Sequence, residues 1–305
     1  MKRRYVTADV FTSEQLKGNQ LAVVLDAEGL STAQMQAVAA EFAYSETTFV
    51  LPPRDQANTA QVRIFTRSRE VPFAGHPNIG TAYVLATGDL AAQEGDQPKP
   101  FIFEELAGLV PVRQLMDGST VVGAELITPE PLSEASELSA AHVAECLSLT
   151  ENDILVTAHP PKVVSVGLPF LVAEVASRSA LAKCIPNLNA YKRFLPLDGA
   201  TSIYVYTRDV AGDPTETHTD IQARMFTPHM TEDPATGSAT AAMAAFFARV
   251  HARPTLSLTV GQGFDMGRAS LLYVNIDTQG EQTQIRVGGN CIRMMEGTFE
   301  LAGEA

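Results

Sequence analysis

The length of 305 residues suggests about two domains, and the shares of 45% apolar and 19% charged residues are typical of globular proteins with packed cores. A formal charge of −13 without any run of basic residues makes nucleic acid and anionic membrane surfaces poor partners. Three scattered cysteines without a CxxC pair, and a start without the apolar core of a secretory signal, predict a cytoplasmic protein with neither a disulfide framework nor a metal site.

The first half of the chain predicts short strands interrupted by one amphipathic helix. Ser31 and Gln34 have the spacing of a capping box, and apolar residues recur at helical spacing from Met35 to Phe42, so we expect a helix over 31–44. Apolar runs bounded by turn residues predict strands at 5–11, 21–25, 47–51 and 61–66.

The second half of the chain predicts mostly strands and one helix that is apolar on every face. The alanine-rich segment 237–248 is too short to span a bilayer, so we expect the protein's own sheet to enclose it. The segment 128–136 is rich in Pro, Glu and Ser, which favours a linker. Because strands and helices do not alternate regularly, a doubly wound parallel sheet is disfavoured. Strands are predicted at 162–166, 171–175, 202–206, 224–227, 256–260, 270–276 and 284–287.

A short segment of the first half recurs in the second half. Residues 76–82 align without a gap on residues 233–239, and each begins with a titratable residue and a proline before a glycine and an apolar run. The repeat favours two related domains, although two helix starts can also resemble each other by chance. Each block predicts a helix N-terminus whose unpaired N–H groups and positive dipole end suit a carboxylate or a phosphate.

Three titratable residues are candidates for chemistry: Glu46, His76 and Asp233. Taken singly, Glu46 reads as a surface carboxylate after a helix, His76 as a turn histidine and Asp233 as the N-cap of the apolar helix. His76 and Asp233 occupy equivalent positions in the two repeats, which favours a function for both. The helix dipole at the start of the first block would also lower the pKa of His76 and favour a neutral imidazole. The chain lacks a GxSxG elbow, a P-loop and a dinucleotide fingerprint, which disfavours hydrolase, kinase and dehydrogenase activities.

Together the motifs resemble those of the phenazine-biosynthesis isomerase family, the PhzF-like proteins. The family usually has proline at the positions of Gln20 and Ala269, and these two departures concern loop shape more than chemistry. The motifs that carry the resemblance are Val10-Phe11-Thr12 with Gly18-Asn19, Ser45-Glu46-Thr47-Thr48-Phe49, Phe73-Ala74-Gly75-His76-Pro77, Gly167-Leu168-Pro169, residues 232–239, Arg268 and Val287-Gly288-Gly289.

The resemblance implies a diaminopimelate-epimerase-like α+β fold of two pseudo-symmetric domains. Each domain would be a mostly antiparallel, curled, barrel-like sheet around a central apolar helix. We expect the domains at 1–130 and 131–305, with the C-terminal tail packing back on the first domain. The family is usually homodimeric and uses no cofactor.

The resemblance also implies the chemistry. The best-known member of the family isomerises trans-2,3-dihydro-3-hydroxyanthranilate by moving a proton between carbons, so phenazine biosynthesis is one option for this chain. Glu46 would be the general base, and His76 and Asp233 would assist protonation. The substrate carboxylate would bind at the two helix starts, at Gly75, Gly237 and Ser238. Two alternatives stay open: a racemase or epimerase of a small amino or hydroxy acid, and a non-catalytic protein that binds a small acid.

Overall fold

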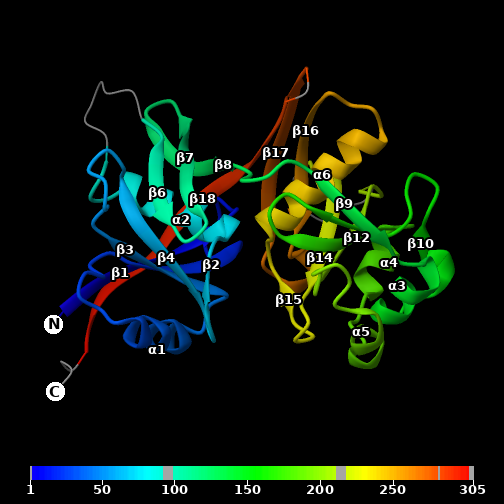
Figure 1. Ribbon diagram of the computed structural model, residues 1–305, viewed down its shortest axis with the longest axis horizontal. Coiled ribbons are helices and arrows are strands. Elements are labelled where there is room, and N and C mark those ends of the chain that lie inside the picture. Colours follow the sequence, from blue (N-terminus) through cyan, green and yellow to red (C-terminus); the bar gives the residue numbers. More distant parts are fainter. Residues whose placement is uncertain (1, 92–98, 211–217, 281, 302–305) are drawn as a thin grey trace. The chain divides into compact units, whose positions relative to one another are not determined.

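The computed structural model describes residues 2–91, 99–210, 218–280 and 282–301 and has a mixed α+β fold with few helices (Figure 1). Contacts within the chain separate two compact units. The first unit comprises residues 1–126 and 288–305, and the second comprises residues 127–287. The domain boundaries predicted from the sequence, 1–130 and 131–305, stay a prediction.

The first unit is a ring of strands around one helix. Each strand pairs with the next along the chain, and β18 pairs with both β8 and β1, which closes the ring. The strands of this ring are β1 (Lys2–Val10), β2 (Asn19–Val24), β3 (Glu46–Leu51), β4 (Ala60–Thr66), β6 (Phe101–Glu105), β7 (Gly108–Asp117), β8 (Thr120–Ile127) and the C-terminal part of β18 (Gln282–Glu300). A closed sheet leaves no edge strand exposed.

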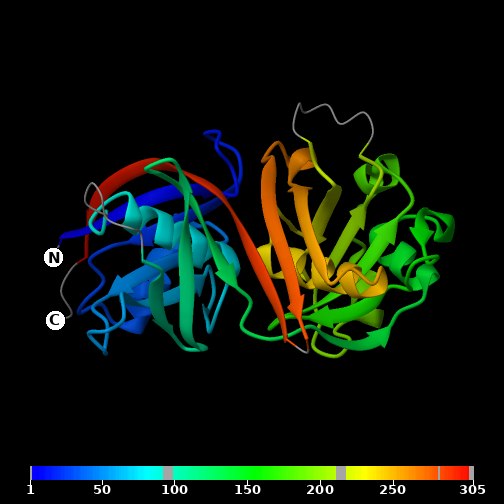
Figure 2. The same cartoon turned by 90° about the horizontal axis from the view of Figure 1, so that it is seen from above.

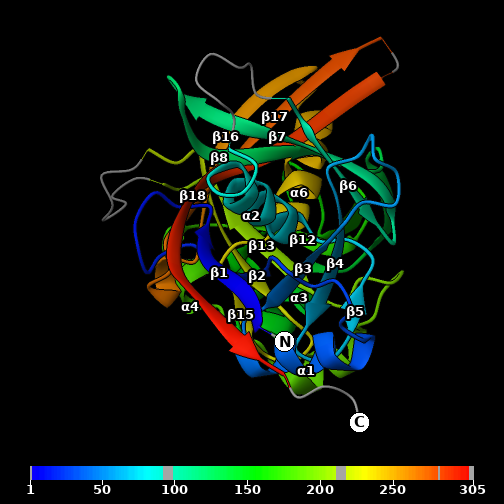
Figure 3. The ribbon, with the colours of Figure 1, turned by 90° about the vertical axis from the view of Figure 1, so that its left-hand side faces the viewer.

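The helix inside this ring is α2 (Gly75–Ala86), which contacts β1, β2, β3 and β7 (Figure 3). Every residue of α2 except Tyr83 is buried, because strands surround the helix on all sides. The short strand β5 (Glu70–Val71) pairs with β4 and precedes the helix. The ring therefore fixes the start of α2.

Outside the ring, α1 (Thr32–Phe42) packs on β3 and β4 and bears out the predicted helix. Both hydrogen bonds of the predicted capping box are present: the Gln34 N–H donates to Ser31 Oγ at 3.3 Å, and the Ser31 N–H donates to Gln34 Oε1 at 2.9 Å. The helix ends where Ala43 adopts a left-handed conformation with φ of 57°.

Replacing Ser31 by Ala should lower the free energy of unfolding by about 1 kcal/mol, because an N–H group at the helix start loses its acceptor. Chemical denaturation of the wild type and of Ser31→Ala measures this difference. Glu41→Ala, at an exposed position near the end of the same helix, is the control. An effect of Ser31→Ala no larger than that of the control would show that water replaces the cap at no cost.

The second unit also surrounds an apolar helix with strands. Helix α6 (Gly237–Val250) contacts β11, β12, β16 and β17 (Figure 2), and its buried face is mostly alanine. The strands pair in the order β9, β11, β12, β13, β14, β16 and β17, and β15 pairs with β14. The strands are β9 (Ser133–Glu137), β10 (Ile154–Leu155), β11 (Lys162–Ser165), β12 (Pro169–Val175), β13 (Ile203–Thr207), β14 (Ile221–Phe226), β15 (Glu232–Asp233), β16 (Thr255–Gln262) and β17 (Ser270–Gln279).

Three further helices of this unit form one apolar cluster with the outer face of the sheet. Cys146 is buried in this cluster. The helices are α3 (Ala140–Leu147), α4 (Arg178–Lys183) and α5 (Leu188–Phe194), and the 3-10 turns of the unit are Glu151–Asp153 and Phe264–Met266. In the described ranges no helix has the length and apolarity that crossing a membrane requires.

The predicted linker at 128–136 is wrong in its second half, because β9 begins at Ser133 and pairs with β11. The side chains of β9 are mostly exposed, so the strand lacks the apolar alternation by which a sequence reveals a strand. Its backbone hydrogen bonds with β11 place it in the sheet, and these depend on tertiary structure alone.

Candidate active site

Two of the predicted site residues meet in the first unit. Glu46 is the first residue of β3, and His76 lies in the first turn of α2. The His76 Nδ1 atom is 3.4 Å from Glu46 Oε2, and the side chains are 6% and 19% exposed, respectively. The structure therefore brings together a carboxylate and an imidazole that are 30 residues apart in the sequence.

The environment of His76 keeps its imidazole neutral. Burial lowers the pKa of His76 to about 3, against the opposing effect of a hydrogen bond to the backbone of Gln20. The contact with Glu46 is thus one between a neutral ring and a carboxyl group at neutral pH. Among the described residues the Nε2 atom of His76 has no hydrogen-bond partner, although it is buried. A neutral imidazole can donate through one nitrogen and accept through the other, so it suits proton relay and polar recognition.

The start of α2 provides a place for an anion next to this pair. Ala74 is the N-cap, and the helix begins at the buried residue Gly75 with no side chain capping it. The Asn78 side chain fixes the N-cap, since its Nδ2 donates to the Ala74 carbonyl at 3.0 Å. Backbone N–H groups at such a helix start favour a carboxylate ligand.

The third titratable residue, Asp233, belongs to the second unit. It lies in β15 opposite Met225 of β14. Its Oδ2 atom accepts a hydrogen bond of 2.5 Å from the hydroxyl of Thr236, the N-cap of α6. The helix then begins with the buried Gly237 and the half-buried Ser238, again without a side-chain cap hydrogen bond.

His76 and Asp233 align in the sequence repeat but have different local structures. His76 lies inside α2, whereas Asp233 lies in a strand that precedes α6. The reason is that α6 begins at Gly237, which aligns with Gly80, while α2 begins five residues before Gly80. The titratable side chains of the two blocks therefore extend from different secondary structures, a helix for His76 and a strand for Asp233.

Sequence reasoning missed the residue that fixes the Asp233 turn, which is Gln262. Its fully buried amide donates through Nε2 to the Asp233 carbonyl at 2.9 Å and to Thr236 Oγ1 at 3.1 Å. Its Oε1 accepts from the Thr236 N–H at 3.1 Å. A signal existed, because Gln262 is a polar residue at the end of an apolar strand, but the sequence did not show what the amide faces.

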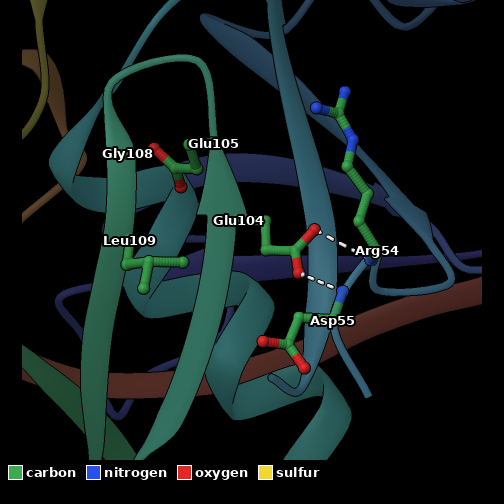
Figure 4. A pocket seen from close by; sticks show the side chains of 6 residues that line it. All are labelled: Arg54, Asp55, Glu104, Glu105, Gly108 and Leu109. Carbon is green, nitrogen blue, oxygen red and sulfur yellow. Dashed lines mark hydrogen bonds between the residues drawn. The ribbon is translucent and has the colours of Figure 1, made fainter. Parts of the chain in front are cut away.

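In the part of the chain that the structure describes, no three His, Cys, Asp or Glu side chains are grouped so that they could hold a metal ion. A pocket of about 370 Å³ in the first unit is lined by Arg54, Asp55, Glu104, Glu105, Gly108 and Leu109 (Figure 4). A pocket of about 140 Å³ in the second unit is lined by Leu188, Tyr191, Lys192, Leu195, Pro196, Thr201 and Pro228.

The first unit thus combines a closed ring of strands around α2 with a carboxylate–imidazole pair formed between β3 and α2. The profile of the phenazine biosynthesis-like protein family matches residues 8–297, and the chain belongs to this family. The resemblance inferred from the motifs is thereby confirmed.

Named relatives of this chain include isomerases. An uncharacterized isomerase of Mesorhizobium japonicum is 37% identical, with 97% of this chain and 98% of the relative covered. The trans-2,3-dihydro-3-hydroxyanthranilate isomerase of Pseudomonas aeruginosa is 35% identical, with 96% and 98% covered. The solved structure of a predicted epimerase from Pseudomonas aeruginosa has a TM-score of 0.79 and 30% identity, with 98% of this chain and 100% of that chain covered. The chain is an isomerase.

Proposed function

We propose that this isomerase moves a proton between carbons of a small carboxylate-bearing substrate without a cofactor, with Glu46 as the general base. The observation that carries the proposal is the contact of the partly buried Glu46 carboxylate with the neutral, buried His76. A relative that is 35% identical over nearly the whole chain is named trans-2,3-dihydro-3-hydroxyanthranilate isomerase, which favours a cyclic, unsaturated amino acid as substrate.

In the proposed mechanism Glu46 removes a proton from a substrate carbon. The C–H electron pair enters the adjacent unsaturated system, the double bond shifts, and protonated Glu46 returns the proton to another carbon. Exclusion of water from the site favours proton abstraction by a carboxylate, because it removes the solvent that stabilises the charged base. His76 donates or accepts hydrogen bonds as a neutral ring and does not act as an imidazolium acid near neutral pH.

Gly75 of α2 and Gly237 and Ser238 of α6 are proposed as substrate-binding residues, because each lies at a helix N-terminus that suits a carboxylate. Neither helix start has a side-chain cap hydrogen bond among the described residues, which leaves its N–H groups for a ligand. Asp233 assists protonation and is held by Thr236 and Gln262. Negative charge that develops on the substrate is stabilised by these N–H groups.

The remaining expectations are part of the same proposal. We propose a cytoplasmic homodimer with two related domains and with no nucleic-acid or membrane partner. The net charge of −13 supports the last two points, because both polyanions repel an acidic protein.

Solvent exchange in D2O tests the proposal. The protein is incubated with trans-2,3-dihydro-3-hydroxyanthranilate and with a panel of small amino and hydroxy acids, and the products are analysed by mass spectrometry and NMR. We expect the double bond of the substrate to shift. The carbon that gains a hydrogen should carry deuterium to the extent that the proton held by Glu46 exchanges with solvent. Unchanged double-bond positions in every compound would contradict the proposed reaction.

A second candidate is an epimerase, because a solved relative that is 30% identical is described as a predicted epimerase. An epimerase needs an acid and a base on opposite faces of one carbon, and the candidate pair in this sequence is Glu46 and Asp233. In the same experiment, deuterium at a stereocentre whose configuration is inverted, without a shifted double bond, would favour the epimerase.

A further inference from the structure

An arginine–glutamate pair holds the short strand that carries Asp233. Arg224 lies in β14, and Glu232 precedes Asp233 in β15, the strand that pairs with β14. The guanidinium binds the carboxylate through two parallel hydrogen bonds, from Nε to Oε1 at 2.9 Å and from Nη2 to Oε2 at 2.7 Å. The two side chains are only 11% and 12% exposed. A two-bond contact of this kind fixes direction as well as distance, and its partial burial reduces screening by salt.

The guanidinium of Arg224 is also held from the side of α4. Its Nη1 atom donates to three carbonyl oxygens at the end of that helix, those of Leu181 at 3.0 Å, Ala182 at 3.2 Å and Cys184 at 3.1 Å. Such carbonyls at a helix C-terminus are natural acceptors for an arginine. The guanidinium also lies over the ring of Phe226, 4.8 Å from the ring centroid. The arginine therefore connects β15 to α4 and has little freedom to follow a movement of β15.

The same kind of pair occurs at the corresponding place in the first unit. Arg63 in β4 binds Glu70 in β5 through Nε and Nη2, both at 2.7 Å. Its guanidinium lies 5.1 Å from the centroid of the Phe65 ring. The strand registers agree, because Phe65 pairs with Glu70 as Phe226 pairs with Glu232. Each pair thus joins the two strands of the short hairpin that precedes the buried helix of its own unit, α2 or α6.

The residue after the glutamate differs between the two hairpins. It is Val71 in the first unit and Asp233 in the second, so only the second hairpin places a carboxylate there. Successive side chains of a strand extend to opposite faces, so Glu232 can bind the arginine without turning Asp233 towards it. The Oδ2 atom of Asp233 accepts instead from the Thr236 hydroxyl. The arginine–glutamate pair therefore acts on Asp233 through the backbone of β15.

We propose that Arg224 and Glu232 are positioning residues, which set the place of the Asp233 carboxylate by fixing β15. Gln262 holds the same turn from β16, through its bonds to the Asp233 carbonyl and to Thr236. Without the arginine–glutamate pair, β15 loses its charged contact with β14, and the turn opens more often. The inference rests on the proposed function only for the role of Asp233 in the reaction.

Hydrogen exchange at one backbone amide tests the positioning role without a substrate. The Thr236 N–H donates to Gln262 Oε1 at 3.1 Å, so its exchange rate reports the opening of the turn. We expect this amide to exchange about tenfold faster in Glu232→Gln than in the wild type, because a neutral amide does not replace the charged two-bond contact. Arg224→Lys should give a similar acceleration, because lysine keeps the charge but lacks the planar guanidinium.

The control is Glu134→Gln, which removes a partly buried carboxylate of the same unit that pairs with Lys162 and Arg249 from β9. Thr236 exchange in this variant should stay within about twofold of the wild type. The amide of Ala244, in the buried centre of α6, reports a general loss of stability and should accelerate less than Thr236 in Glu232→Gln. Unchanged Thr236 exchange in Glu232→Gln, or an acceleration no larger than that of Ala244, would overturn the proposal.

Turnover separates this inference from the proposed function. If Asp233 assists protonation, kcat of Glu232→Gln and of Arg224→Lys should fall about tenfold, while KM changes less than about threefold, because a misplaced group slows proton transfer more than binding. Faster exchange at Thr236 with an unchanged kcat would support the positioning role and remove Asp233 from the proposed reaction. A lower kcat without faster exchange would leave the proposed reaction standing and overturn the positioning role.

Discussion

Replacing Glu46 by Gln is expected to lower kcat by about 10³-fold, within the range that a general base contributes to proton transfer. Glutamine keeps the size of the side chain and a hydrogen-bond acceptor but cannot take a proton from carbon. A loss of this size corresponds to about 4 kcal/mol of transition-state stabilisation. The measurement is the initial rate of product formation with the substrate that the exchange experiment identifies, together with deuterium uptake by that substrate.

The control for this variant is Glu41→Gln, which removes an exposed carboxylate near the end of α1, five residues away. It should leave the rate within about twofold, as expected of a surface position. Circular dichroism should show the same fold for both variants. A Glu46→Gln enzyme that retains the rate of the Glu41→Gln control would remove Glu46 from the mechanism.

Replacing Gly123 by Ala is expected to destabilise the first unit by about 3 kcal/mol, at the upper end of the usual cost of overpacking. Gly123 lies in β8, and a Cβ atom there would be 2.1 Å from the carbonyl oxygen of Gly289 and 2.8 Å from the Cα of Asn290. Both contacts are with backbone, so no side chain can move aside. The strands β8 and β18 must separate at the place where the ring closes.

Urea denaturation measures this loss, and hydrogen exchange should show faster exchange of the β8 amides in Gly123→Ala. Thr120→Ala, at an exposed position of the same strand, is the control and should change the free energy of unfolding by less than about 0.5 kcal/mol. Equal stability of Gly123→Ala and the control would mean that the ring closes with a wider spacing at no cost.

The structure gives a physical reason for one of the family motifs. Gly288 belongs to the Val287-Gly288-Gly289 motif, and a Cβ on it would be 2.5 Å from the Glu125 Cβ and 2.6 Å from the Ala124 carbonyl oxygen. Glycines on both strands thus allow β8 and β18 to approach closely. The sequence reveals the glycines, but the strand that each of them faces is set by the closure of the sheet.

Local sequence patterns predict the two helices that begin at Ser31 and Gly237 but not every strand. The helix beginning at Ser31 is predictable because its cap and its apolar spacing lie within a dozen residues. The apolar helix from Gly237 is predictable as a buried element for the same reason. In contrast, β9 has no apolar alternation, and only its pairing with β11 defines it.

By itself the sequence determined the strands with apolar patterns, the amphipathic helix from Ser31, the buried helix from Gly237, the family and the candidates Glu46, His76 and Asp233, because each of these depends on residue types at short spacing. Only the tertiary structure decided that Glu46 Oε2 lies 3.4 Å from His76 Nδ1 and that Gln262 holds the Asp233 turn. These contacts join residues that are far apart in the chain. The pairing and register of the strands bring them together, and the burial that results lowers the pKa of His76.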